Sequence, residues 1–195
     1  MQVRSFTAEA RRTQIVGAAI EVIAEVGYPQ ASFARIAERA RLSSTRLISY
    51  HFAGKKELIE EVVAQLYREI GGHMSERVSA AATPLAALHA YIEGYVEFVA
   101  GHRTQMKALL SIFLNGALEF DPAEQEAVVL SPVEQILRDG QAAGAFRQCD
   151  LRVAAAAVQR SLDGIPLMLE SHPDLDLETC ARELVTLFDH ALCAS

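Results

Sequence analysis

The chain has 195 residues, of which 51% are apolar and 22% charged, and this balance excludes an intrinsically disordered protein and favours a globular one. Its three cysteines, Cys149, Cys180 and Cys193, are too widely spaced to form a disulfide framework or a zinc motif. The formal charge is −7, no signal peptide is recognisable, and no run nears the roughly 18 apolar residues of a membrane span, so we expect a cytoplasmic protein without membrane contact.

Two helices are predicted in the first forty residues. From Thr7 onward apolar residues recur at helical spacing as far as Val26, and Gly27 ends this first helix. After Gly27, Ser32 is suited to cap a second, short helix. The inward positions of this second helix are Phe33, Ile36, Ala37 and Ala40.

A third and a fourth helix follow closely. The pattern breaks at Leu42, and one of the next two serines can cap a third helix from Thr45 to His51. Residues 52–54 end that helix, and Gly54 is a tolerable N-cap for a fourth helix that begins at Lys55. The apolar stripe of the fourth helix continues toward residues 71–72, with a possible extension to Val78, so it connects the first part of the chain to the second.

The remainder is predicted to form five further helical segments. Their boundaries are plausible helix stops and starts at residues 83–84, 101–102, 121–122, 144–150 and 172–174. The last two segments, Leu151 to Leu169 and Leu177 to Leu192, are rich in leucine and small residues, which permits close helix approach. We therefore predict an all-α fold, with a three-helix module at residues 1–54 and a larger helical domain at residues 55–195.

Charge is distributed unevenly between these two parts. Residues 1–56 contain nine Lys and Arg against four Glu, a formal charge of +5. Residues 57–195 contain nine Lys and Arg against 21 acids, a formal charge of −12. Contact with a polyanion needs local positive charge rather than a positive total, so the asymmetry favours a nucleic-acid-binding first part. Taken alone, an uneven distribution by chance explains it equally well.

The predicted third helix has the chemistry of a groove-reading helix. Three short helices in about fifty residues, the second and third joined by a tight turn, are typical of modules that place a recognition helix in the DNA major groove. Leu47, Ile48 and Phe52 are expected to face inward, which leaves polar side chains outward. Arg46 can grip a guanine with two hydrogen bonds. The side chains able to donate to phosphates or bases are Ser43, Ser44, Thr45, Arg46, Ser49, Tyr50 and His51.

A second anion site is predicted where the fourth helix begins. Lys55 stands there beside the unpaired backbone N–H groups that every helix N-terminus presents. A Ser, Thr and Arg-rich helix can equally be an ordinary solvated face, so the order of the neighbouring elements has to decide between the two interpretations.

That order resembles the DNA-binding signature of the TetR family of regulators. The matching runs are ASFARIAERA at residues 31–40, LS at 42–43 and ISYHFAGKKEL at 48–58, within a resemblance that covers Arg11 to Val63. By this resemblance, phosphate contacts fall to Ser32, to Tyr50 or His51, and to Lys55. Base contacts fall to Ser44, Thr45, Arg46 and Ser49.

Two departures from the family pattern stand out. Arg41 occupies the position where these proteins usually have the glycine of the turn, and it either contacts a phosphate or points to solvent. The stretch from Ala40 to Phe52 is one residue longer than the commonest spacing, so assignments inside the third helix can shift by one.

In the larger part the resemblance implies a role but few residues. Apolar and aromatic side chains there can line a cavity for a small organic ligand, or they can be plain core. The candidates are Tyr91, Tyr95, Phe98, Met106, Leu110, Phe113, Leu114, Phe120, Leu137 and Met168. By analogy with the family, the last two helical segments pair with their two-fold mates as a homodimer, which suits a palindromic operator of double-stranded DNA.

The expected function is therefore a dimeric DNA-binding transcriptional regulator, a repressor released by a small, hydrophobic effector. Enzyme function has little support, because the six histidines form no HExxH and no P-loop, GxGxxG or GxSxG occurs, so we expect no catalytic residue, metal or cofactor. The alternative is a helical adaptor that binds only protein, which gives no reason for the basic first part.

Overall fold

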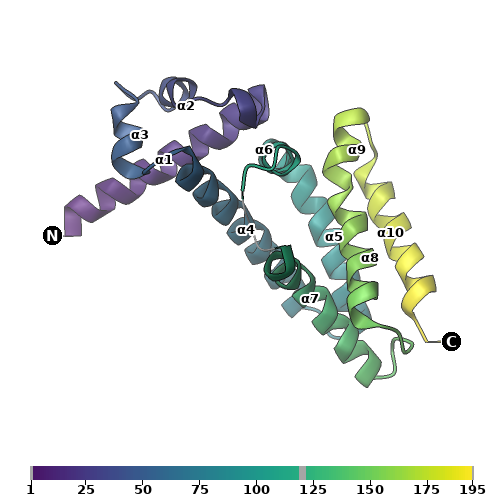
Figure 1. Cartoon of the computed structure of the whole chain (residues 1–195). Coiled ribbons are helices and arrows are strands. Elements are labelled where there is room, and N and C mark those ends of the chain that lie inside the picture. The colour runs from purple at the N-terminus through teal and green to yellow at the C-terminus, as the bar shows by residue number, and fades with distance from the viewer. Residues whose placement is uncertain (1, 119–121, 195) are drawn as a thin grey trace. The chain divides into compact units, whose positions relative to one another are not determined.

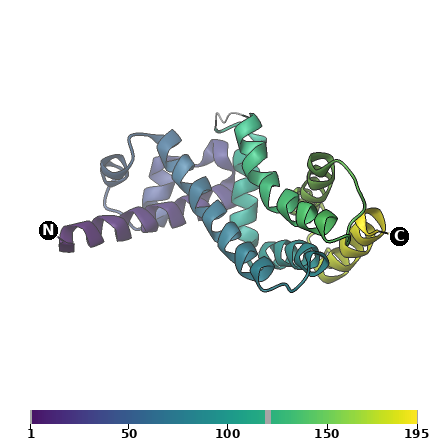
Figure 2. The same ribbon diagram turned by 90° about the horizontal axis from the view of Figure 1, so that it is seen from below.

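A computed structural model describes residues 2–118 and 122–194, and these residues form helices without any named strand (Figures 1 and 2). The fold is therefore all-α, as predicted. Contacts divide the chain into two compact units, Met1–Arg68 with Arg103–Glu119, and Glu69–His102 with Phe120–Ser195. The first unit thus includes a helix at 103–114, which the predicted functional division at residues 54 and 55 assigns to the larger domain.

The first unit is built around a long N-terminal helix, α1 (Gln2–Val26), which packs against α2 (Phe33–Arg39) and α6 (Arg103–Leu114). A 3-10 turn, η1 (Tyr28–Gln30), follows Gly27, whose φ of 80° is a conformation that suits glycine. The helix α3 (Arg46–His51) and the first part of α4 (Lys55–Ser79) complete the unit. Its fully buried side chains include Ile15, Ile23, Ile36, Ile48, Phe52, Leu58, Ile59 and Ile112.

Most of the predicted ends of the first four helices are confirmed by the structure. The helix α4 begins at Lys55, where the amide of Leu58 bonds to the carbonyl of Gly54, and continues to Ser79 through Gly71 and Gly72. In contrast, α1 begins at Gln2, earlier than the predicted Thr7. The predicted serine cap of the third helix is wrong, because Thr45 is the N-cap and makes no side-chain capping bond.

The second unit is arranged around α5 (Pro84–Gly101), which packs against α7 (Pro122–Ala142), α8 (Leu151–Asp163) and α10 (Leu177–Leu192). In both views these helices run beside one another (Figures 1 and 2). Eight of the twelve residues of α5 from Leu88 to Val99 are buried, and Glu93 and Glu97 are exposed. An isolated antiparallel bridge between Phe146 and Cys193 ties the chain end to the segment before α8.

One predicted segment is divided in the structure. Residues 151–169 were expected to form a single helix, but α8 ends at Asp163 and a separate helix, α9 (Ile165–Ser171), begins after Gly164. Pro166 explains the break, because proline has no N–H to continue the ladder of α8 yet fits the first turn of a new helix.

Candidate DNA-binding surface

The turn between α2 and α3 is a helix-ending motif with an arginine at its key position. The amide of Leu42 bonds to the carbonyl of Ala37 at 2.8 Å and that of Arg41 to the carbonyl of Glu38 at 3.0 Å, the two bonds of a Schellman motif. The motif needs a left-handed residue, and Arg41 has a φ of 52°. This geometry accounts for the glycine expected at this position by resemblance.

The register of α3 follows from the side chains that it buries. Ile48 and Phe52, four residues apart, are buried, as predicted, and Leu47 is half-buried. The opposite face is open to solvent, with 81% of Tyr50 exposed. Half-buried His51 lies edge-on to Tyr50, with ring centroids 5.1 Å apart. The exposed polar residues of the turn and helix are Ser43, Ser44, Thr45, Arg46 and Ser49.

Arg12 of α1 binds the end of α3, a contact that the local sequence does not predict. The guanidinium of Arg12 donates a hydrogen bond to the carbonyl of His51 and lies 4.2 Å from the ring centroid of Phe52. It also pairs with Glu61 at 3.3 Å and with Glu57 at 3.7 Å, both on α4. A cation at a helix C-terminus is favourable, so Arg12 joins α1, α3 and α4 through one side chain.

The start of α4 is tied to α6 through Tyr28. The ammonium of Lys55 donates to the carbonyl of Tyr28 at 2.9 Å and lies 4.2 Å from the centroid of its ring. The amide of Tyr28 in turn donates to the hydroxyl of Ser111 on α6 at 2.9 Å. Partial burial lowers the pKa of Lys55. The predicted anion-binding lysine is therefore partly engaged within the protein.

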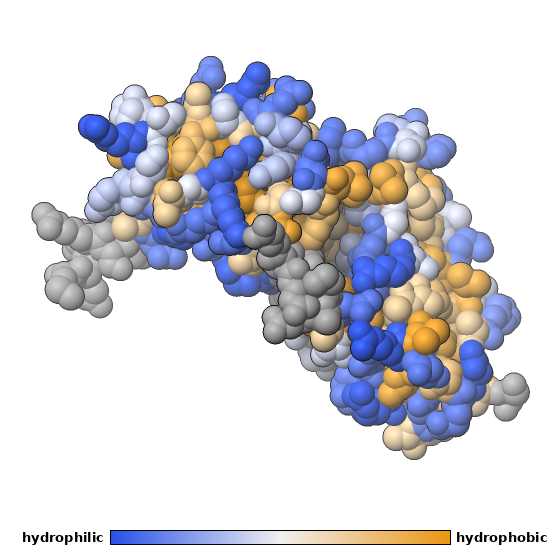
Figure 3. All heavy atoms as spheres, viewed as in Figure 1, coloured by the Kyte–Doolittle hydropathy of each residue, from blue (hydrophilic) through white to orange (hydrophobic). Residues whose placement is uncertain are grey.

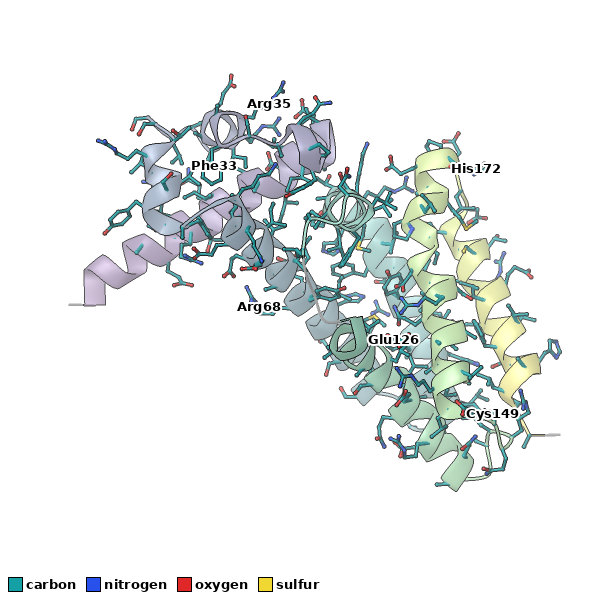
Figure 4. The ribbon with its side chains drawn as sticks, viewed as in Figure 1. Phe33, Arg35, Arg68, Glu126, Cys149 and His172 are labelled. Carbon is teal, nitrogen blue, oxygen red and sulfur yellow. The ribbon has the colours of Figure 1, made fainter. Side chains whose placement is uncertain are left out.

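Most basic groups of this unit have partners of their own, but three arginines do not. Arg39 pairs with Glu21 and Glu25, and its hydrogen bonds with these two acids raise its pKa. Among the described Lys and Arg side chains of this unit, those without a hydrogen bond or ion pair are Arg35, Arg41 and Arg46, all exposed. Arg35 is on the first turn of α2 (Figure 4), and sequence reasoning did not select it.

Two of these three arginines, Arg41 and Arg46, lie in a segment without acids. Residues 39–56 contain no Asp or Glu, so neither the turn nor α3 supplies an acid beside Arg41 and Arg46. Ser32 caps α2 by accepting from the amide of Arg35 at 3.3 Å, which leaves its hydroxyl proton free to donate. The exposed surface of the segment is therefore rich in donors and positively charged, which suits phosphate and base-edge contacts.

The residues predicted to line a ligand cavity fall into both units. Met106, Leu110, Phe113 and Leu114 are on α6 in the first unit, and Tyr91, Tyr95, Phe98, Leu137 and Met168 are in the second. Tyr91, Tyr95, Phe98, Met106 and Leu137 are buried, while Leu110 is half-buried. Phe113, Leu114 and Met168 are exposed, so they are not interior residues of their units. Phe120 lies outside the described residues.

Two of the buried aromatic residues already have specific partners. The ring of Phe98 stacks on His102 with centroids 4.0 Å apart, and His73 approaches it edge-on at 5.5 Å. The hydroxyl of Tyr91 donates to the side-chain oxygen of buried Gln159 at 2.7 Å. Burial, with the nearby charge of Asp163, raises the pKa of Tyr91, which therefore stays protonated and able to donate.

Neither a metal site nor a membrane-spanning helix is present in the part of the chain that the structure describes. No group of three His, Cys, Asp or Glu side chains there is placed to hold a metal ion. None of the described helices combines the length and the apolar character that a membrane crossing requires.

Comparison with known proteins agrees with this geometry. Residues 15–62, which contain α2, α3 and their turn, match the family described as "Bacterial regulatory proteins, tetR family". The HTH-type transcriptional regulator BetI of Cronobacter sakazakii is 30% identical over 186 residues, which cover 91% of this chain and 88% of that protein. The regulator BetI 1 of Chromohalobacter salexigens is 33% identical over 104 residues, so the match spans about half of each protein, 53% and 51%.

The fold is shared with solved structures as well. The transcriptional regulator FadR from Bacillus subtilis, crystallised in complex with stearoyl-CoA, superposes with a TM-score of 0.77 at 23% identity. The superposition covers 90% of this chain and 96% of that one.

Proposed function

The chain belongs to the TetR family of DNA-binding transcriptional regulators, and from this premise we propose that it represses transcription by binding a palindromic operator as a dimer. The observation that carries the proposal is Arg46, which is exposed at the first position of α3 and forms no hydrogen bond or ion pair with any described residue. An arginine so placed can grip the O6 and N7 atoms of a guanine in the major groove.

The roles proposed for the remaining contacts follow from their geometry. Ser44, Thr45 and Ser49 are exposed beside Arg46 and are assigned to base edges. Ser32, together with Tyr50 or His51, is assigned to phosphates. Lys55 is assigned there too, because an ammonium has three N–H donors and the bond to Tyr28 uses one of them. Ser43 and Arg35 are exposed and available for further phosphate contacts.

The proposed dimer uses the face formed by α8, α9 and α10. Large apolar side chains are exposed there, with Val153 exposed by 68%, Leu187 by 56% and Leu167 by 51%. Figure 3 shows such apolar residues among polar ones on this face. Exposed apolar side chains gathered on one face mark interaction sites, and a two-fold dimer buries the same patch on both copies. The dimer would carry two recognition helices to successive major grooves, about 34 to 36 Å apart.

The effector is proposed to be a small, hydrophobic molecule that releases the protein from DNA. The buried aromatic and apolar residues of α5, among them Tyr91 and Tyr95, are of the kind that accept such a ligand. A structural neighbour was crystallised with stearoyl-CoA, a ligand with a long apolar chain. A ligand that fits one conformation better shifts the population toward it, and DNA affinity falls if that conformation separates the two α3 helices.

DNA binding is tested with Arg46→Ala and a matched control. The control is Arg138→Ala, which removes another exposed arginine, on α7, and changes the net charge by the same amount. Fluorescence anisotropy with duplexes from the upstream region of the gene is expected to show a loss of about tenfold or more for Arg46→Ala and none for the control. Equal affinities for wild type and both variants would contradict the assignment of Arg46, and equally weak binding by all three would favour a protein-binding adaptor.

The dimer is tested separately by sedimentation. Leu187→Glu places a charge in the proposed interface, whereas Val128→Glu changes an exposed valine of α7 outside it. We expect Leu187→Glu to sediment as a monomer and Val128→Glu as a dimer. Dimers of both variants would place the interface elsewhere.

A further inference from the structure

Arg41 adopts a backbone conformation that favours glycine, in the middle of the proposed DNA-binding surface. We propose that Arg41 contacts an operator phosphate and that the protein retains it at the expense of folding stability. The proposal rests on the proposed DNA-binding function. It adds to that function a residue of the turn that contacts DNA and lowers the stability of the free protein. Three observations carry it: the strained backbone, the unused side chain and the position of the turn.

The backbone of Arg41 is strained by a requirement of the turn. Its φ of 52° lies in the left-handed region, where the Cβ of an L-residue crowds the following carbonyl oxygen. The conformation is imposed by the two hydrogen bonds that end α2, from Leu42 to Ala37 and from Arg41 to Glu38. Glycine has no Cβ and adopts this conformation without the clash. The fold alone therefore favours glycine at position 41.

The side chain of Arg41 makes no contact that offsets this strain in the described part of the folded protein. It is exposed, and within the described part of the chain it takes part in no hydrogen bond or ion pair. Arg39, two residues earlier, shows the contrasting case, because it binds Glu21 and Glu25 on α1. One internal benefit is open to Arg41, the attraction of a cation to the C-terminal end of α2. The experiment separates this benefit from DNA contact.

The position of Arg41 is suited to a phosphate contact. It stands between α2 and α3, five residues before Arg46, in the segment 39–56 that contains no acid. Backbone strain kept at one residue is commonly part of function, and a guanidinium is the side chain that binds phosphate most specifically. The residue thus has a use in the DNA complex that it lacks in the free protein.

Three substitutions separate the strain from the charge. Arg41→Gly removes both, Arg41→Ala removes the charge and keeps the Cβ, and Arg41→Lys keeps both. Arg138→Ala is the control for the loss of one exposed arginine. Each full-length protein is measured by thermal unfolding without DNA and by anisotropy with upstream duplex DNA over a salt series.

The expected pattern differs between the two measurements. Arg41→Gly should unfold about 2 °C higher than wild type, while the alanine and lysine variants stay close to wild type. Affinity for DNA should fall about tenfold for the glycine and alanine variants. It should stay at the wild-type value for Arg41→Lys and for the control Arg138→Ala. In the glycine and alanine variants the slope of log affinity against log salt should shrink by about two, because each subunit of a dimer loses one phosphate contact.

Each departure from that pattern overturns a stated part of the proposal. Unchanged DNA affinity and salt slope in Arg41→Ala, with Arg46→Ala still impaired, would exclude the phosphate contact and leave the proposed function standing. A fall in stability in Arg41→Ala would show that the cation serves α2 instead. No gain in stability in Arg41→Gly would contradict the claim that Arg41 lowers the stability of the fold. Absence of DNA binding by the wild-type protein would instead contradict the proposed function itself.

Discussion

Replacement of Arg12 by methionine should loosen the recognition helix without emptying the space that the arginine fills. Methionine is long and apolar enough to remain packed over Phe52. The substitution removes the hydrogen bond to the carbonyl of His51 and the ion pairs with Glu57 and Glu61. What is lost is the link between the end of α3 and its neighbours.

The magnitude follows from the exposure of the groups involved. A hydrogen bond from a charged donor contributes about 1.5 to 3 kcal/mol, and the 32% exposure of the Arg12 side chain places this one at the lower end. Partly exposed ion pairs contribute about 0.2 to 1 kcal/mol each, and the cation over Phe52 about 0.5 to 1 kcal/mol. One guanidinium makes all four contacts, so they are not additive, and we expect a loss of about 2 kcal/mol.

Urea unfolding of Arg12→Met beside Arg11→Ala measures this loss. Arg11 is the matched control, because its guanidinium bonds Gln14 on the same helix and pairs with no described residue of α3 or α4. The control should change the free energy of unfolding by less than about 0.5 kcal/mol. Equal unfolding curves for the two variants would refute the reasoning, since they would show that the contacts of Arg12 do not hold the folded state together.

Two further predictions concern a buried hydrogen bond and acid stability. Tyr91→Phe leaves the buried oxygen of Gln159 without its donor, so urea unfolding should show a loss of about 1 to 3 kcal/mol, and a loss near zero would mean that the bond is not formed. The hydrogen bond from Arg68 holds the pKa of Glu61 below its ordinary value of 4.5, despite an opposing effect of burial. Because the folded pKa is lowered, Glu61 stabilises the protein above pH 4.5 and less as the pH falls through the lowered value. The urea midpoint of Glu61→Gln should therefore vary less than that of wild type below pH 4.5, and parallel pH curves would contradict the assignment.

Local patterns predicted the helices of the DNA-binding surface well, because their signals are adjacent in sequence. Gly54 before Lys55 predicted the start of α4, and the apolar spacing of Ile48 and Phe52 predicted the buried face of α3. The split between α8 and α9 was missed, although Pro166 carries the signal, because the apolar pattern continues across it.

Contacts between distant segments lie beyond such patterns. Arg12 meets the carbonyl of His51, which is 39 residues away, and the sequence around Arg12 resembles any charged, exposed stretch of a helix. The partners of Phe98 illustrate the same limit, since two histidines on either side of α5 in sequence converge on its ring only in the folded protein. Composition could therefore nominate Phe98 as a cavity residue but could not assign its neighbours.

The most direct test of the account is the salt dependence of wild-type binding to two duplexes, one from the upstream region of the gene and one with the same bases shuffled. We expect preference for the natural duplex and a steep fall of affinity between about 50 and 200 mM salt, because lysines and arginines displace counterions from phosphates. Weak, equal binding to both duplexes, with little response to salt, would contradict a sequence-reading DNA surface on α2 and α3.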